Sequence, residues 1–264
     1  MMRYPRVYFV LITNGFMLIF GYSMLRSFLA NYARQLDPTG ILAGFTISSY
    51  FFARTFIELP SGFISDRIGR RKPIVLGMLL GALGAIVCSL SSVSIYFLII
   101  GLMVWGLGAA LVFTNNMALI IDLFEPKVRG RALGNFQGIE FIGSFAGAPI
   151  GGFLAELFLG HDLGYAAVFY VIGASIFAAF LAAYTSKELK ETSRRPREGS
   201  TGPSFRETLR GLKNWGLLIT CTVSFLRMFI MMGVFSTIFP IYLEDVIRLS
   251  EGPRGIVFGA RTGG

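Results

Sequence analysis

The stretch that decides the fold is GFISDRIGRRKP, residues 62–73, a short charged segment between two long apolar ones. The apolar neighbours, residues 41–61 and 74–90, are each close to the roughly 20 residues that a helix needs to cross a bilayer. The segment itself places one acid, Asp66, among four basic residues, which makes it too polar to lie in hydrocarbon. We therefore interpret it as a tight loop that joins two membrane-spanning helices.

The composition of the whole chain supports this interpretation. Of 264 residues, 54% are hydrophobic and only 15% are charged, whereas soluble domains carry about 25% charged residues. A soluble domain of this size has too small a core to bury so much apolar surface, and a disordered chain needs low hydrophobicity. The composition therefore argues against a soluble enzyme and against disorder, and favours an all-α membrane protein.

Seven apolar segments are long enough to be spans: residues 7–28, 41–61, 74–90, 94–121, 132–159, 166–184 and 215–243. The first is too long for a signal peptide, and no small-residue cleavage site follows it. With the N-terminus inside, most of the 24 Lys and Arg residues fall in the inner loops, as the positive-inside rule requires. We predict an integral protein of the plasma membrane with a cytoplasmic N-terminus, and the same rule explains the net charge of +9 without a nucleic-acid partner.

The segment between the sixth and seventh spans differs from the rest. Residues 186–214 are polar, with Pro and Gly at their centre, and predict a cytoplasmic linker between two membrane units. Residues 1–185 would form a six-helix bundle, and residues 215–264 would begin a second bundle with a seventh span and a truncated eighth. A weak repeat supports this division, because FFARTF at 51–56 returns as FGARTG at 258–263. Parallel repeats of this kind occur in transporters.

Two further segments carry more information than hydropathy. One joins IGLMVWGLGAA, residues 100–110, to DLFEPKVRGRALG, residues 122–134, and the other is the glycine-rich fifth span. Together with residues 62–73 they closely resemble the major facilitator superfamily, and the resemblance covers essentially the whole chain. The charged loop matches the family signature G-x-x-x-D-R-x-G-R-R-K. The fifth span is similar to the family's antiporter signature G-x8-G-x3-G-P-x-x-G-G.

The chain departs from these patterns at two positions. The proline of the antiporter signature belongs at Ala148, whereas here it stands at Pro149. In the fourth span, Leu102 occupies the position where drug antiporters of the family often have Arg. That Arg is linked to proton handling, so the sequence does not support proton coupling by that route.

The resemblance implies a role for the charged loop. In the family, the Asp and Arg that match Asp66 and Arg70 latch the two halves when the protein faces outward, with the carboxylate matching Asp122 as partner. The resemblance assigns the latch and its turn to Gly62, Asp66, Arg67, Gly69, Arg70, Arg71 and Asp122. From the residues alone, a plain positive-inside loop remains an alternative. It does not explain the acid or the two glycines, which permit a tight reversal.

The fifth span carries a stripe of small residues. Gly143, Gly147 and Gly151 recur every four residues and let another helix approach closely, while Pro149 removes a backbone donor and can bend the helix. With Gly152, they form the predicted packing set. Two interpretations stay open, ordinary helix packing and a functional contact. The resemblance implies that this stripe meets the eighth span and controls leak between the halves.

Polar residues inside the spans are the remaining candidates, because charged groups are costly in the membrane. They are Asn14, Arg54, Glu58, Asn115, Asn116, Glu140 and Arg227. Arg54 and Glu58 lie four residues apart and share a helix face, and Glu140 lies at a similar depth to Arg54. For Arg54 the alternatives are a substrate or coupling role and a structural ion pair. For the asparagines they are substrate contact and interhelical hydrogen bonding.

We therefore predict a secondary active transporter that moves a small solute by alternating access. Protons are the favoured coupling ion, with Glu58, Glu140 or Asp122 as carriers, and the glycine series favours efflux of drugs or amphipathic compounds. The partners would be membrane lipid, the solute and a missing C-terminal half. No enzyme motif, cofactor or metal site is found, since the two cysteines lie in apolar stretches and His161 is the single His. The alternative is a truncated, transport-incompetent fragment that only associates with other membrane proteins.

Overall fold

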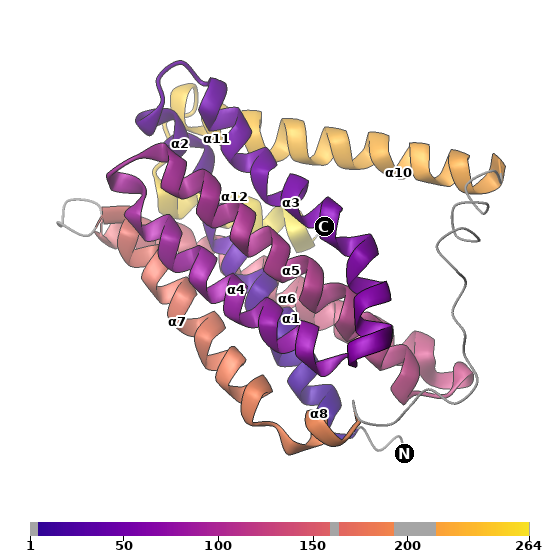
Figure 1. The fold of residues 1–264 in the computed structure, drawn as a ribbon. Helices are drawn as coiled ribbons and strands as arrows, with labels where there is room; N and C mark the ends of the chain where they lie inside the picture. Colours follow the sequence, from indigo (N-terminus) through magenta and orange to yellow (C-terminus); the bar gives the residue numbers. More distant parts are fainter. Residues whose placement is uncertain (1–4, 159–163, 193–214, 264) are drawn as a thin grey trace.

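A computed structural model describes residues 5–158, 164–192 and 215–263, and within these ranges every regular element is a helix (Figure 1). The elements of the first unit are α1 (Arg6–Leu25), α2 (Leu29–Leu36), α3 (Ile41–Ile68), α4 (Arg71–Ser89), η1 (Leu90–Ser92), α5 (Ile95–Leu123), α6 (Pro126–Phe158), α7 (Gly164–Thr185) and α8 (Lys187–Thr192). The later elements are α10 (Trp215–Gly233), η2 (Val234–Ile238), α11 (Phe239–Asp245) and α12 (Glu251–Gly263). The all-α prediction is confirmed.

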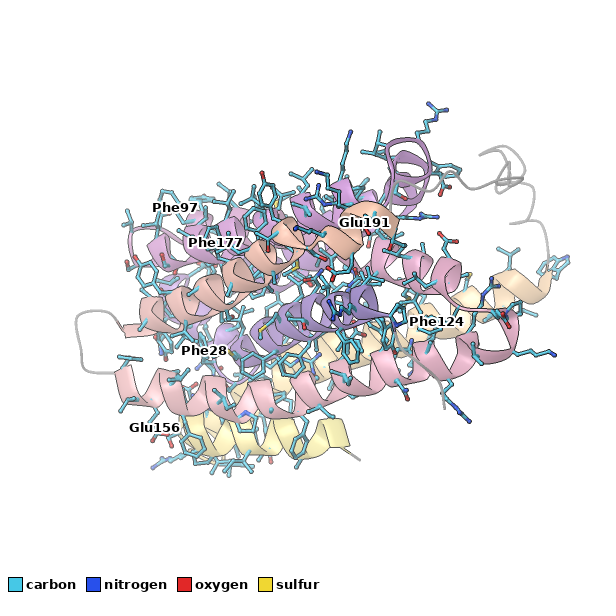
Figure 2. All side chains as sticks on the ribbon, turned by 90° about the horizontal axis from the view of Figure 1, so that it is seen from below. Phe28, Phe97, Phe124, Glu156, Phe177 and Glu191 are labelled. Carbon is cyan, nitrogen blue, oxygen red and sulfur yellow. The ribbon has the colours of Figure 1, made fainter. Side chains whose placement is uncertain are left out.

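The six long helices α1 and α3–α7 run up and down between two ends of one bundle. The end that carries residues 62–73 and 125–131 is here called the basic end, and the opposite end, with α2, α11 and the start of α12, is the distal end. Figure 2 shows Phe124 and Glu191 toward the basic end and Phe28 and Glu156 toward the distal end. Short connections between antiparallel neighbours account for this arrangement.

Close approaches between glycines hold the bundle together. Helix α5 packs between α3 and α4, α4 also packs on α7, and α1 packs on α6 and α7. A Cβ added to Gly77 would lie 2.5 Å from the Gly108 carbonyl oxygen, and one on Gly84 would lie 2.6 Å from that of Gly101. Trp105 fills the interior beside these contacts and is fully buried. Lipid provides no hydrophobic driving force between helices, so van der Waals contact at such close distances stabilises their association.

Local chemistry fixes where helix α3 begins and ends. At its start, the Asp37 carboxylate accepts a 2.8 Å hydrogen bond from the Leu42 backbone N–H, which satisfies a donor of the first turn. At its end, Gly69 adopts a φ of 87°, which favours glycine and reverses the chain into α4. Gly62 lies inside α3, so the prediction that it forms part of the reversal is wrong. Nothing local stops the helix at Gly62, because one glycine within a helix is tolerated.

Five helices are long and apolar enough to cross a membrane, judged by length and composition: α1, α4 with η1, α5, α6 and α7. Helix α3 is longer than most of them, but Arg54 and Glu58 interrupt its apolar stretch. In the region predicted as the seventh span, the apolar helix is the shorter segment Leu218–Arg227. Helix α10 extends away from the bundle and continues through η2 into α11 (Figure 1).

The predicted linker falls largely outside the described residues. Its first part forms the short helix α8, whereas residues 193–214 are among those not described, as is His161. The division into a first bundle, a linker and the start of a second bundle stays a prediction. In both units a short helix precedes a longer one: α2 precedes α3, and α11 precedes α12. The weak internal repeat would require this shared order.

Candidate functional site

At the basic end, Arg70 lies between two carboxylates. Its Nη2 is 2.7 Å from Asp66 Oδ1, its Nε is 3.5 Å from Asp122 Oδ2, and its Nη1 donates to Ser65 Oγ at 2.6 Å. The Arg70 side chain is only 12% exposed, whereas that of Asp66 is 47% exposed. The Arg70 guanidinium is nearly buried and has three acceptors, whereas a charge in a plain positive-inside loop would be solvated. The arrangement ties together the ends of α3, α4 and α5.

The neighbouring basic residues of this loop have separate positions. Arg71 reaches α7, where its Nη2 donates to the Tyr184 carbonyl at 2.6 Å and its guanidinium lies 5.7 Å from the Tyr184 ring centre. Arg67 is exposed in the last turn of α3, where a cation interacts favourably with the helix dipole. These contacts lie within the first bundle, so the predicted latch between two halves stays a prediction.

The predicted Arg54–Glu58 pair is formed on α3, with the two side chains 29% and 42% exposed. Arg54 Nε is 2.5 Å from Glu58 Oε1, and the guanidinium lies 5.0 Å from the centre of the Phe113 ring. Glu140 does not join this pair, since no Arg54–Glu140 ion pair occurs among the described residues. Instead, the Glu140 side chain lies against α1 at Gly15, and its buried Oε1 has no hydrogen-bond partner.

The three asparagines are fully buried, but they differ in their contacts. Asn115 Nδ2 donates to Ser61 Oγ on α3 at 2.8 Å, and Asn116 Nδ2 donates to the Leu11 carbonyl on α1 at 3.1 Å. Both are interhelical hydrogen bonds. Asn14 has no partner on either side-chain atom. Buried polar atoms normally have partners, so Asn14 differs from Asn115 and Asn116, whose amide groups donate to neighbouring helices.

The glycine stripe of α6 meets α1 rather than the eighth span. A Cβ added to Gly143 would lie 3.1 Å from the Phe16 ring, one on Gly147 would lie 2.5 Å from the Phe20 carbonyl oxygen, and one on Gly151 would collide with the backbone of Met24. The neighbouring face of α6 meets the start of the predicted eighth span instead. There Gly152 abuts the Glu251 carbonyl, and Pro149 abuts Gly255 and Gly259 of α12. The implied contact is therefore wrong for the stripe itself and holds for Gly152 and Pro149.

Arg227 lies on α10, outside the six-helix bundle. Its side chain is exposed, and α10 packs mainly against its own continuation η2. The structure therefore does not bring Arg227 together with the interior candidates of the first bundle. Among the residues that the structure describes, no three His, Cys, Asp or Glu side chains are grouped as metal ligands.

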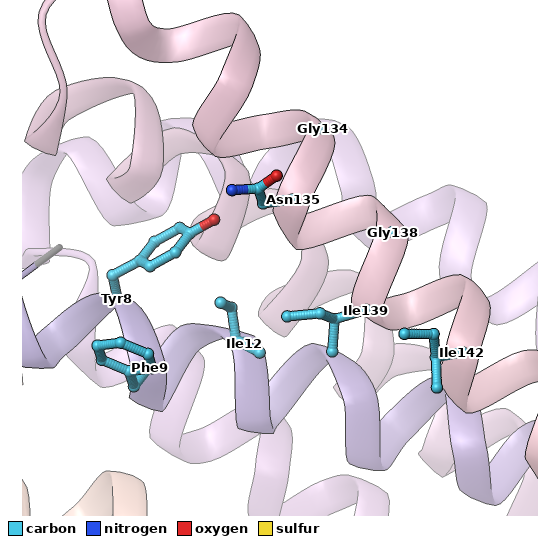
Figure 3. Close-up of a pocket in the computed structure, with 8 residues that line it drawn as sticks. All are labelled: Tyr8, Phe9, Ile12, Gly134, Asn135, Gly138, Ile139 and Ile142. Carbon is cyan, nitrogen blue, oxygen red and sulfur yellow. The ribbon is translucent and has the colours of Figure 1, made fainter. Parts of the chain in front are cut away.

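An open groove of about 460 Å³ lies between the basic halves of α1 and α6 (Figure 3). Its lining is Tyr8, Phe9 and Ile12 from α1 and Gly134, Asn135, Gly138, Ile139 and Ile142 from α6. A Cβ added to either groove glycine would meet no atom within 4 Å, so these glycines leave space rather than fit a helix. The groove was not predicted from the sequence, although the four-residue spacing of Gly134 and Gly138 was a signal.

Comparison with known proteins decides the family. Residues 11–262 match the profile described as Major Facilitator Superfamily. The chain belongs to this superfamily. The resemblance seen in residues 62–73 and in the fifth span is therefore confirmed. Members of this superfamily are membrane transporters rather than enzymes.

Two relatives and one solved structure describe where the chain stands within the Major Facilitator Superfamily. It is 23% identical over 258 residues to quinolone resistance protein NorA of Staphylococcus aureus (strain MSSA476), covering 97% of this chain and 63% of NorA. It is 27% identical over 187 residues to multidrug resistance protein 1 of Bacillus subtilis (strain 168), covering 71% of this chain and 46% of that protein. The fold matches an inward-facing bacterial homolog of the human lysosomal transporter Spinster with a TM-score of 0.73 at 19% identity, over 97% of this chain and 57% of that one. The chain thus spans less than two thirds of the length of these relatives.

Proposed function

We propose that this chain works in a secondary active transporter that moves a small solute across a membrane by alternating access. The observation that carries the proposal is the superfamily match over residues 11–262. The polar groups inside the apolar bundle support it, because charged and amide side chains are costly there and mark solute or ion paths. The basic end would face the cytoplasm of a cell whose plasma membrane holds the protein, as the excess of Lys and Arg at that end favours.

The solute we propose is an amphipathic compound that is exported. Two relatives carry the names quinolone resistance protein and multidrug resistance protein, and drugs of this kind combine apolar rings with a polar group. The groove between α1 and α6 offers apolar surface from Ile12, Ile139 and Ile142 beside the polar ends of Tyr8 and Asn135. Pockets of this mixed character are typical of small-molecule sites.

Protons are the coupling ion that we propose, with Glu140 as the principal carrier. Of the three predicted carboxylates, Glu58 is engaged by Arg54 and Asp122 by Arg70. Glu140 has an interior oxygen without a partner, which leaves it available to a proton or to a cationic solute. In this scheme the Asp66–Arg70–Asp122 cluster keeps the ends of α3, α4 and α5 in the arrangement that closes the basic end.

The test uses the polypeptide expressed from its native reading frame and reconstituted in liposomes with an imposed pH gradient. We expect transport of a fluorescent amphipathic dye that collapses when a protonophore is added. Glu140→Gln should abolish the response to the gradient, whereas Glu191→Gln, an exposed carboxylate on α8, should leave it unchanged. Loss of gradient dependence in both variants, or in neither, would contradict the role of Glu140.

A second measurement addresses the basic-end cluster. Asp66→Asn should shift the equilibrium between the two access states, read from the distance between spin labels at the ends of the bundle. An unchanged equilibrium would refute the latch. Absence of any transport, together with stable copurification of another membrane protein, would favour the alternative of an associating fragment.

A further inference from the structure

A charge pair at the distal end joins two short helices that are far apart in the sequence. Arg34 Nη1 and Nη2 on α2 each lie 2.7 Å from a carboxylate oxygen of Asp245 on α11, which is a bidentate geometry. The same helices are linked where Asn31 Nδ2 donates to the Pro240 carbonyl at 3.4 Å. The side chains of Arg34 and Asp245 are 39% and 46% exposed. Water can therefore solvate both charges when they separate, and the pair is easily broken.

A second charge cluster lies within the segment that forms α11 and α12. Arg254 is only 1% exposed, with Nη1 2.6 Å from Glu244 Oε2 and Nη2 2.7 Å from Glu251 Oε2. Separating a buried cation from its carboxylates is costly, because it leaves a charge uncompensated away from water. These three residues, here called the Arg254 brace, therefore hold α11 and α12 together.

The brace is linked to the first bundle through Glu251. While Glu251 Oε2 holds the brace, its Oε1 accepts a 2.8 Å hydrogen bond from the Tyr165 hydroxyl at the start of α7. The Tyr165 ring stacks on Phe28, with 5.0 Å between ring centres, so its hydroxyl is well positioned. On α6, the Glu156 carboxylate accepts a 3.0 Å hydrogen bond from the Gly252 backbone N–H. Glu156 is an exposed residue near the distal end of α6, and through this hydrogen bond it contacts the first turn of α12.

We propose that three of these contacts form the closure of the distal side in the transport cycle. They are Arg34–Asp245, Tyr165–Glu251 and Glu156–Gly252, and each joins the first bundle to the α11–α12 segment. All three, together with the longer Asn31–Pro240 hydrogen bond, break when the distal side opens. The Arg254 brace stays intact and moves with α11 and α12 as one unit. This inference rests on the proposed alternating access.

The relative strengths of the contacts favour a movement in which the closure contacts break and the Arg254 brace stays intact. The closure consists of one half-exposed ion pair and two single hydrogen bonds, which water can replace when they separate. The brace is centred on the buried Arg254 guanidinium, which is paired with two carboxylates at once, and only its Glu244 member is partly exposed. A movement that separates the two units therefore proceeds through the closure and spares the brace.

The experiment measures the width of the distal end in lipid nanodiscs without substrate. Spin labels are attached at Pro38→Cys and Ile247→Cys, two exposed positions on opposite sides of the closure, after exposed Cys221 is replaced by Ser. The weakened variant is Tyr165→Phe, which keeps the ring and removes the hydroxyl. The matched control is Tyr170→Phe, which makes the same change at an exposed position of the same helix.

We expect Tyr165→Phe to raise the population with the longer label distance about tenfold, because a hydrogen bond to a charged acceptor is lost. Adding Asp245→Asn should raise it further, and Tyr170→Phe should leave the distance distribution unchanged. If neither the single nor the double variant raises that population, the closure proposal is overturned.

Dye transport, measured on the same protein, separates this proposal from the proposed function. A wild-type protein that transports no dye, with variants that still open the distal end, would refute the transport proposal and support the closure. A wild-type protein that transports dye, with label distances unchanged in both variants, would overturn the closure alone.

Discussion

Replacing Gly151 by Ala gives the sharpest test of how α1 and α6 pack. An added Cβ at Gly151 would lie 2.6 Å from the Met24 carbonyl carbon and still closer to its oxygen and Cα. Ordinary contact begins at 3.4 Å, so the two backbones must separate by about 0.8 Å or more. The obstacle is backbone, which cannot rotate aside as a flexible side chain would.

The expected cost follows from this collision. Overpacking a well-packed interior costs about 1–3 kcal/mol, and at Gly151 the helix-propensity gain of Ala over Gly, about 1 kcal/mol, offsets part of it. The same substitution at Gly138 on the same helix meets no atom within 4 Å and keeps the propensity gain. We therefore expect Gly138→Ala to be about as stable as the wild type or more stable, and Gly151→Ala to be about 1–3 kcal/mol less stable than Gly138→Ala.

The assay is the apparent midpoint of thermal unfolding in one detergent, followed by the reactivity of buried Cys88 with a thiol dye after exposed Cys221 is replaced by Ser. A difference of about 2 kcal/mol corresponds to about 4–8 °C for a chain of this length. Equal midpoints for Gly151→Ala and Gly138→Ala would refute the backbone contact between α1 and α6.

Three further changes address single contacts. Tyr8→Phe removes the buried 2.6 Å hydrogen bond to the Ala132 carbonyl and should lower the free energy of unfolding by about 1 kcal/mol, read as a lower midpoint. Asp37→Ala removes the acceptor for the first-turn amides of α3 and should speed their hydrogen exchange about fivefold, while exchange in α7 stays unchanged. The hydrogen bond from Arg34 lowers the pKa of Asp245 below its ordinary 3.8, so the pair is intact above that value and is lost as pH falls through the lowered pKa. The distance between the labels at Pro38→Cys and Ile247→Cys should therefore be constant from pH 7 to about 4 and lengthen only below, and lengthening already at about pH 5 would contradict the assignment.

Features set by helix periodicity could be predicted from the sequence alone. The Arg54–Glu58 pair and the alignment of Gly143, Gly147 and Gly151 both follow from residues three to four positions apart lying on one helix face. The positive φ at Gly69 was also foreseeable, because a reversal between two helices needs a residue without a Cβ.

Features set by the rotation of one helix against another could not be predicted. The stripe of α6 meets α1, the Glu140 carboxylate lies against Gly15 without an ion pair to Arg54, and Arg34 meets a residue 211 positions away. These outcomes depend on how all six helices fill space together, and no local pattern records them. A complementary signal was present in Gly255, since small residues on α12 match those on the second face of α6.

Helix α6 presents two neighbouring faces to two partners, and the polar contacts distinguish them. Toward α1, Tyr8 donates to the Ala132 carbonyl and Ser23 donates to that of Ser144, at 2.6 Å each. The two acceptor carbonyls, of Ala132 and Ser144, are 12 residues apart on α6, which is about 18 Å along the helix. Helix α1 therefore cannot tilt against α6 without breaking one of these hydrogen bonds. Toward α12, the described polar contact is that of Glu156, at the distal end, and the remaining surface is apolar, with Ala148, Pro149 and Gly152 of α6 lying close to α12. A helix that is held by a polar contact at one end only can tilt about that end. The same helix therefore has one interface anchored at two points and one anchored at a single point, which is what the proposed alternating access would require.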